Sequence, residues 1–311
     1  MSNTNHRPMD FSSVVGQEKS IRQLKIHLNA YEKRGGSFQH VLLSGPAGNG
    51  KTTLAEILAR RLNLKFVRFI GANLTSVPDF RERLSGLMAN TVIFIDEIHS
   101  MGRRTQEIIY RLMEDGILEI EVEEFDGGKF KTEVHVDNVV VVGATTNAGQ
   151  LTAAMRTRFG IDLVLSPYTP EQLLEIARFA TKDTWTDSAL QDVVRISRGV
   201  PRTIVNFIGL AEDYYLADDR NLEQLDSQVI ADMREDRSLN PNGTTEQDWL
   251  YITALLQTFG NNPTGVDSIA SVTGIDKETI VSVIEPYLIQ LGYVLRTQAG
   301  RVVNSEKLTL N

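Results

Sequence analysis

The chain has 311 residues and a formal net charge of −8, from 32 Lys and Arg against 40 Asp and Glu. Its 41% hydrophobic and 23% charged residues are ordinary for a globular protein, no apolar run reaches membrane-spanning length, and the first residues lack the apolar stretch of a signal peptide. Because cysteine is absent, disulfides and thiolate metal sites are excluded. We expect a cytoplasmic protein of two or three domains with no membrane partner. Its acidic balance argues against a broadly basic nucleic-acid coat, but it leaves room for DNA binding through a few arginines.

The first half of the chain alternates strand-like and helix-like segments. Helical patterns such as 51–63 and 104–116 lie between short apolar runs at 40–45, 65–70, 91–96, 138–145 and 161–166. Near-continuous apolar strands separated by helices predict a parallel sheet that is covered on both faces. An extra segment, 117–136, alternates apolar and polar residues around Asp126-Gly127-Gly128, which predicts a β-hairpin.

The pattern changes after residue 166. Thr169-Pro170-Glu171 combines a capping hydroxyl with proline at the first helical position, and the chain then reads as helix to about residue 237. A polar linker at 238–247 precedes a helix at 248–260, two shorter helical patterns and two short strands around Ala299-Gly300. Three helices followed by a hairpin are typical of a winged helix. We therefore predict an α/β core at 1–166, a helical lid at 167–240 and a winged helix at 241–311.

The segment GPAGNGKTT at 45–53 fits the phosphate-binding pattern GxxxxGK[ST]. It follows a predicted strand and opens a predicted helix, so it has the context that the motif requires. Glycines allow successive backbone N–H groups to face phosphates, and the helix N-terminus adds positive partial charge. We expect Lys51 to reach the β- and γ-phosphates, Thr52 to ligate Mg²⁺ and Thr53 to bond a phosphate oxygen of ATP. The loop residues of this predicted site are Gly45, Gly48 and Gly50.

Acidic and polar side chains follow two other predicted strands. In VIFIDE at 92–97, Asp96 is expected to hold Mg²⁺ through water and Glu97 to polarise the water that attacks ATP. Thr146, at the end of the strand 139–145, is expected to orient that water; the alternative is a threonine that caps its own loop. His99 is read as a structural histidine at a helix start, and no histidine cluster predicts a metal site.

These motifs, together with RPMDFSSVVGQ at 7–17, RTRFG at 156–160, GVPR at 199–202 and EPYLIQLGY at 285–293, resemble the RuvB family. Members of that family are AAA+ motors that drive branch migration of Holliday junctions, and the resemblance covers nearly the whole chain. It implies a P-loop AAA+ core with a parallel sheet, a helical lid, a C-terminal winged helix and a hexameric ring. The alternatives are a clamp-loader-like or initiator-like AAA+ switch that remodels proteins on DNA, and a non-catalytic scaffold gated by nucleotide.

The resemblance also implies roles for single residues. Arg7 and Tyr168 match positions around the base or ribose, and Arg202 matches the second sensor on the lid. Arg158 matches an arginine finger that acts on the next subunit's ATP; the alternative is a helix-end arginine that bonds local carbonyls or acids. Glu114 and Asp115 resemble a stretch close to the adjoining subunit's nucleotide.

In the winged helix, Lys277, Arg296 and Arg301 match the family's basic positions and are expected to contact DNA phosphates. The alternative is a winged helix that packs between proteins, since acids outnumber bases after residue 240. The hairpin 117–136 departs most from the family. The resemblance implies an apolar tip that docks on a RuvA partner, whereas EEFDGGKF is acidic and offers only Phe125 and Phe130 as anchors. A RuvA-like partner is therefore one possibility for this chain.

Overall fold

The computed structural model describes residues 8–85, 89–123, 129–181, 184–217 and 224–308. The chain divides into two compact units, and each is described by itself. The first contains residues up to Ile176 together with Val200–Arg202, and the second contains Ala177–Gly199 and the chain from Thr203 onward. The predicted domain boundaries at 166 and 240 remain predictions. Among the described residues, no helix is both long and apolar enough to cross a bilayer.

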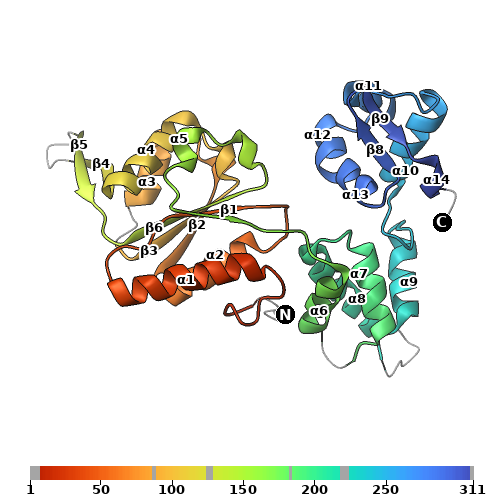
Figure 1. Ribbon diagram of the computed structural model, residues 1–311, viewed down its shortest axis with the longest axis horizontal. Helices are drawn as coiled ribbons and strands as arrows, with labels where there is room; N and C mark the ends of the chain where they lie inside the picture. Colours follow the sequence, from red (N-terminus) through yellow and green to blue (C-terminus); the bar gives the residue numbers. More distant parts are fainter. Residues whose placement is uncertain (1–7, 86–88, 124–128, 182–183, 218–223, 309–311) are drawn as a thin grey trace. The chain divides into compact units, whose positions relative to one another are not determined.

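The first unit is built on a five-stranded sheet, which confirms the predicted α/β core (Figure 1). All strand pairs are parallel, in the order β2-β3-β6-β1-β7. Each of the five apolar runs named from the sequence forms one of these strands. Their bounds are β1 Val41–Ser44, β2 Lys65–Ile70, β3 Thr91–Asp96, β6 Val139–Thr145 and β7 Ile161–Val164.

Helices cover both faces of this sheet because successive strand residues point to opposite sides. Val41 and Leu43 pack in one apolar core with residues of α1 and α2, whereas Leu42 belongs to a second core with α3, α4 and α5. Sequence analysis did not assign α1 or α3. The helices of this unit are α1 Glu18–Arg34, α2 Lys51–Leu62, α3 Val77–Ser85, α4 Arg103–Asp115, α5 Ala153–Arg156 and most of α6 Pro170–Ala180.

The predicted β-hairpin is confirmed as an antiparallel pair outside the main sheet. Strands β4 (Ile117–Glu123) and β5 (Lys129–His135) pair in register from Ile117 and His135 to Glu123 and Lys129. Ion pairs join its base to α3 and α4: Arg81 to Glu119 at 2.9 Å and Arg111 to Glu133 at 2.6 Å. The predicted turn Asp126-Gly127-Gly128 and Phe125 lie outside the described residues.

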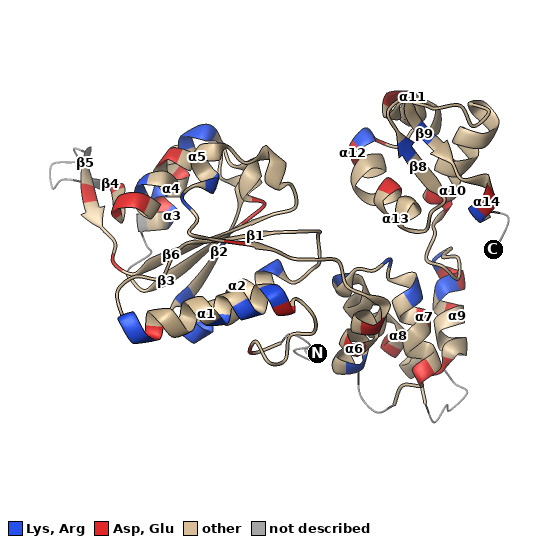
Figure 2. Cartoon of the chain, viewed as in Figure 1, with Lys and Arg blue, Asp and Glu red and all other residues tan. Residues whose placement is uncertain are grey.

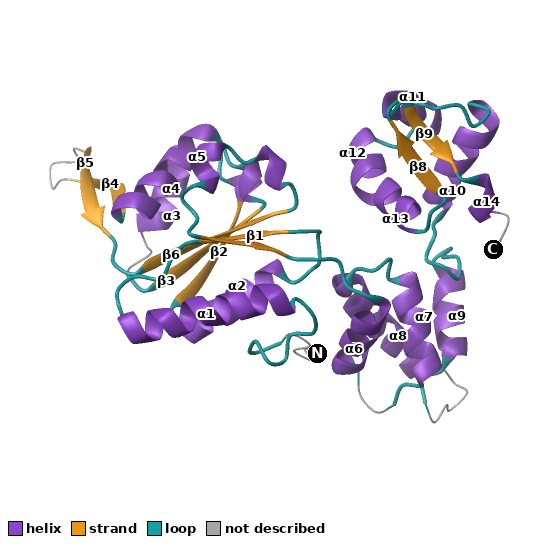
Figure 3. Cartoon of the chain, in the orientation of Figure 1, coloured by secondary structure: helices purple, strands orange, loops and turns teal. Residues whose placement is uncertain are grey.

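The second unit is mostly helical, as Figure 3 shows by colour. Its first part contains α7 Asp187–Ile196, most of α8 Pro201–Ala217 and α9 Ser227–Asp236. The expected helix start is confirmed in the first unit, since α6 begins at Pro170 and the Thr169 hydroxyl accepts a bond from the Gln172 N–H. Thr186 and Asp226 cap α7 and α9 in the same way, which explains why the chain turns into helix at these positions.

The remainder of the second unit is a winged helix, as predicted. Its apolar core joins residues such as Tyr251, Ile269, Leu288 and Val294 from three helical segments and the hairpin. The strand β9 begins at Gly300, which has a φ of 145°. A side chain would not fit at this position, because a Cβ there would lie 2.5 Å from the Thr264 nitrogen. The elements are α10 Glu246–Thr253, α11 Val266–Thr273, α12 Lys277–Thr279, α13 Glu285–Gln290, β8 Val294–Thr297, β9 Gly300–Val303 and α14 Ser305–Leu308, with π-helical turns at Ala254–Thr258 and Ile280–Ile284.

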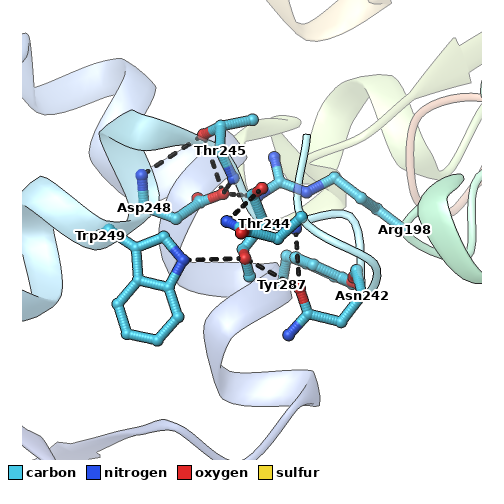
Figure 4. A network of polar contacts seen from close by, with 8 residues as sticks. Arg198, Asn242, Thr244, Thr245, Asp248, Trp249 and Tyr287 are labelled. Carbon is cyan, nitrogen blue, oxygen red and sulfur yellow. Dashed lines mark hydrogen bonds and ion pairs between the residues drawn. The ribbon is translucent and has the colours of Figure 1, made fainter. Parts of the chain in front are cut away.

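A polar network joins the end of α7 to the winged helix (Figure 4). Arg198 pairs with Asp248, whose side chain is 0% exposed. The Arg198 guanidinium also lies 4.4 Å from the centre of the Tyr287 ring. Asp248 also accepts bonds from the Thr245 N–H and hydroxyl, at 2.7 and 2.9 Å, in the capping box of α10. One buried carboxylate therefore serves both a helix cap and the connection to the helical part.

Candidate functional site

The loop between β1 and α2 has the backbone that a phosphate-binding loop needs. Gly45, Gly48 and Gly50 have φ values of 147°, 78° and 87°, in the region that favours glycine. Space is also short, since a Cβ on Gly45 would lie 2.6 Å from the Leu165 carbonyl oxygen and one on Gly48 would lie 2.5 Å from Val200 Cγ1. Thr52 and Thr53 stand in the first turn of α2, so the loop leads into a helix N-terminus, the arrangement that binds anions.

Lys51 is folded back onto this loop. Its ammonium donates to the carbonyl oxygens of Gly45 at 2.7 Å and Pro46 at 3.0 Å, and the residue is only 6% exposed. Burial lowers the pKa of Lys51, while the carboxylates of Glu97 and Asp96 act in the opposite direction. Two carbonyl dipoles and two acids thus hold a buried cation at the loop, where a phosphate would be a stronger partner.

Tyr168 lies beside the same loop, together with a residue that sequence analysis missed. The Tyr168 hydroxyl donates to the Asn49 carbonyl at 3.4 Å, and burial raises the pKa of this phenol. Gln17 exchanges two hydrogen bonds with the backbone of Ser166, at 2.8 and 3.0 Å, and therefore fixes the start of α1 beside the end of β7. Arg7, the other residue expected around the base or ribose, lies outside the described residues.

Asp96 ends β3 at the carboxyl edge of the sheet, where open α/β sheets bind ligands. Its carboxylate accepts a bond at 2.5 Å from Arg68 on β2, a contact that sequence analysis did not foresee. The strand register pairs Ile70 with Asp96, so Arg68 reaches along its own strand to the acid. The Asp96 carboxylate therefore has a cationic partner within its own chain, and its role toward Mg²⁺ remains a prediction.

Glu97 and Thr146 meet at the same edge. The Glu97 carboxylate accepts bonds from the Thr146 N–H at 3.0 Å and hydroxyl at 2.9 Å, so the structure brings together the two residues expected to act on the attacking water. His99 also faces Glu97: its Nδ1 lies 3.2 Å from that carboxylate and 2.8 Å from the buried Thr145 hydroxyl. His99 was read as structural, and its contacts add it to the surroundings of Glu97.

Gly71, directly after the neighbouring strand β2, supports Glu97. Glu97 has a φ of 48°, and a Cβ on Gly71 would lie 2.3 Å from the Glu97 carbonyl oxygen. Only glycine fits beneath this turn. The sequence gives no sign of this requirement, since Gly71 belongs to no motif and is distant from Glu97 along the chain.

Arg158 is held within its own chain. Its guanidinium pairs with Glu114 at 2.8 Å, donates to the Ala154 carbonyl at 2.5 Å and lies 4.2 Å from the centre of the Tyr110 ring. These contacts are the ones expected of the alternative, a helix-end arginine that bonds local carbonyls and acids. An action of Arg158 on a neighbouring subunit's ATP remains a prediction. Glu114 is half exposed and meets Arg158, while Asp115 is the last residue of α4.

Arg202 belongs to the first unit, next to the phosphate-binding loop. A Cβ on Gly48 would lie 3.5 Å from Arg202 Cβ, and the arginine's charge contributes to lowering the pKa of Lys51. The position agrees with a cation directed at phosphates. Its role as a sensor remains a prediction.

Each of the three basic residues expected to contact DNA has an acidic partner in the winged helix. Lys277 pairs with Asp267 at 2.8 Å, and both side chains are exposed. Arg296 and Arg301 both pair with Glu285, which is fully buried. Figure 2 shows acidic and basic segments interspersed along this part of the chain.

A parallel sheet, a phosphate-binding loop that opens a helix, and paired acids beside a threonine at the carboxyl edge define a P-loop ATPase of the AAA+ class. Residues 6–165 match the model of the Holliday junction DNA helicase RuvB P-loop domain, and residues 241–309 match the RuvB C-terminal winged helix domain. The chain therefore belongs to the RuvB family.

Known RuvB proteins are similar to this chain over nearly its whole length. A Holliday junction branch migration complex subunit RuvB from Ehrlichia canis is 35% identical over 99% of this chain and 93% of its own length. The subunit of the same name from Phytoplasma mali is 34% identical, over 96% of this chain and 90% of its own length. The solved structure of the RuvB Holliday junction branch migration motor from Thermotoga maritima has a TM-score of 0.83 and 30% identity, covering 98% of this chain and 97% of that one.

Proposed function

We propose that this chain is an ATP-hydrolysing motor subunit that drives branch migration of Holliday junctions in recombination and repair. Membership of the RuvB family over nearly the full length supports the assignment. The observation that carries the chemistry is the meeting of Glu97 and Thr146 at the edge of the sheet that also holds the phosphate-binding loop. A scaffold that only binds nucleotide would not need a carboxylate and a hydroxyl in this arrangement.

Glu97 is the general base of the proposed hydrolysis. A carboxylate within hydrogen-bond reach of a water can accept its proton as the water attacks the γ-phosphate. Thr146 holds the carboxylate through two bonds at 3.0 and 2.9 Å, and a hydroxyl at this place can also orient the water. His99 Nδ1 lies 3.2 Å from the same carboxylate oxygen and further limits the movement of Glu97.

The cations of the site bind the phosphates. In this proposal Lys51 exchanges its two carbonyl partners for phosphate oxygens, and Arg202 adds a second positive charge from the start of α8. Thr52 and Asp96 offer the oxygen donors that Mg²⁺ prefers, and Asp96 would exchange its partner Arg68 for the ion. When bound, Mg²⁺ would neutralise charge on the phosphates.

Arg158 acts in trans in this proposal, which requires a neighbouring subunit and a ring, expected to be a hexamer. In the single chain the guanidinium rests on Glu114 and Tyr110, so entry into a neighbour's site exchanges those contacts for phosphate oxygens. Glu114 and Asp115 lie on α4, the helix on which Arg158 rests, and are proposed to face the same intersubunit site.

The DNA is expected to meet the winged helix through phosphate contacts, which are independent of sequence and weaken with salt. A RuvA-type partner would dock on the hairpin of β4 and β5, whose base is fixed by Arg81 and Arg111. The acidic character of that hairpin predicts a more polar contact than the apolar tip implied by the family.

A four-way-junction migration assay tests the function. The purified chain is incubated with ATP, Mg²⁺ and a labelled junction, with and without a RuvA-type partner, and ATP hydrolysis is measured in the same samples. Junction-dependent hydrolysis together with strand separation is the expected result. DNA-stimulated hydrolysis without migration under either condition would favour the clamp-loader-like or initiator-like switch, and nucleotide binding without hydrolysis would favour the scaffold.

A further inference from the structure

Glu285 is a fully buried acid in a domain that is expected to bind a polyanion. It begins α13, directly after the π-helical turn Ile280–Ile284, and its side chain is 0% exposed. An unpaired carboxylate would be costly at such a place, so its partners decide why it is there. All of them are polar groups of the winged helix, and two are the arginines expected to meet DNA.

The hydrogen bonds use both carboxylate oxygens. Oε1 accepts from Arg301 Nε at 2.8 Å and from the Tyr251 hydroxyl at 3.1 Å. Oε2 accepts from Arg301 Nη2 at 3.3 Å and from Arg296 Nη2. Burial by itself would raise the pKa of Glu285, but the bonds and charges of the two arginines outweigh burial and lower it, so the acid is ionised at neutral pH.

The two arginines lie opposite each other in the hairpin, but they differ in exposure and in their contacts with Glu285. Arg296 on β8 and Arg301 on β9 are register partners across the hairpin. Arg301 makes a two-pronged contact with the carboxylate and its side chain is 16% exposed, whereas Arg296 makes a single contact and is 49% exposed. A largely buried fork that is bonded at both prongs cannot turn toward a phosphate without giving up two bonds to the buried acid, which would then keep only the single contact from Arg296.

We propose that Glu285 is a positioning residue of the DNA interface: it commits Arg301 to the interior of the wing and presents Arg296 as the side chain that meets a DNA phosphate. The cluster of two arginines and one carboxylate carries one net positive charge, so the wing offers DNA one phosphate contact where the sequence alone suggests two. This inference rests on the proposed DNA function. A single contact of this kind suits a motor that must release DNA at every step.

The test compares four variants of the full chain: Arg296→Gln, Arg301→Gln, Glu285→Gln and the double variant Glu285→Gln/Arg301→Gln. Binding of a fluorescein-labelled duplex is measured by anisotropy over a range of salt concentrations. Because the slope of log Kobs against log[salt] changes by about 0.9 for each phosphate contact, it counts contacts. A purely structural role would change thermal stability and leave that slope as it is.

The expected pattern is a rescue. Arg296→Gln and Arg301→Gln should each lower the slope by about one contact, the first by removing the contact and the second by leaving Arg296 neutralised by Glu285. Glu285→Gln should steepen the slope by about one contact, because Arg301 is released from the acid and adds its charge to that of Arg296. The double variant keeps one net charge and Arg296, so its slope should return to the wild-type value, and it removes a buried acid and its partner together if Glu285→Gln alone folds poorly.

The outcomes separate the inference from the function on which it rests. A double variant that remains as weak as Arg301→Gln would show that Arg301 meets DNA itself, and the positioning role of Glu285 would be wrong. If no variant alters DNA binding at any salt concentration while all remain folded, the winged helix is not the DNA interface, and that part of the proposed function fails. Tyr251→Phe is the matched control, since it removes one bond to Glu285 and no charge.

Discussion

The pairing of Arg198 with Asp248 leads to a prediction whose size follows from the structure. In Asp248→Ala, Arg198 loses the acid that compensates it and α10 loses its capping carboxylate. Breaking a buried pair by removing one partner costs about 3–5 kcal/mol, and a helix cap contributes about 1 kcal/mol. Since one carboxylate has both roles, we expect a loss of about 4 kcal/mol, which corresponds to a melting temperature lower by about 10 °C.

Tryptophan fluorescence is the appropriate assay. The chain has two tryptophans, Trp185 and Trp249, and both belong to the second unit, so their emission follows the unfolding of that unit alone. Asp267→Ala is the matched control, because it deletes an acid of the same type in the same winged helix, from a pair in which both side chains are exposed. Exposed pairs contribute little, so the control should melt as the wild type does. Equal melting temperatures for the two variants would refute the reasoning.

The remaining predictions concern ATP. Lys51→Ala should abolish hydrolysis, since it removes the charge expected on the β- and γ-phosphates, and undiminished turnover in the purified variant would overturn the nucleotide-site assignment. Glu97→Gln should still bind a fluorescent ATP analogue but fail to cleave ATP, because an amide is not a base; normal cleavage would exclude Glu97 as the base. Arg158→Ala should hydrolyse ATP about 10³-fold more slowly, and mixing it with Lys51→Ala should restore part of the activity, because some interfaces then pair an intact loop with an intact finger. Complete subunit exchange, shown by fluorescence transfer between labelled chains, without any rescue would place Arg158 in cis.

Much of the core could be read from the sequence because its signals are local. Apolar runs of strand length predicted all five parallel strands, and a glycine-rich loop between strand and helix predicted the phosphate site. The meeting of Glu97 with Thr146 was also within reach, since the carboxyl ends of parallel strands share one edge of the sheet. Helices α1 and α3 were not predicted although each buries an apolar face; Gln17, before α1, makes no side-chain capping bond that would mark a helix start.

What the sequence by itself determined is the class of fold, the place of the nucleotide and the resemblance to one family, because motifs and periodicity are properties of adjacent residues. Only the tertiary structure decided which charges neutralise one another. Nothing in the sequence near Arg68 indicates Asp96 as its partner. Likewise, nothing near Glu285 indicates that it pairs with a largely buried Arg301 and a half-exposed Arg296. Such pairs form between residues that the fold brings together, and burial then sets their strength, so neither partner carries a local signal of the other.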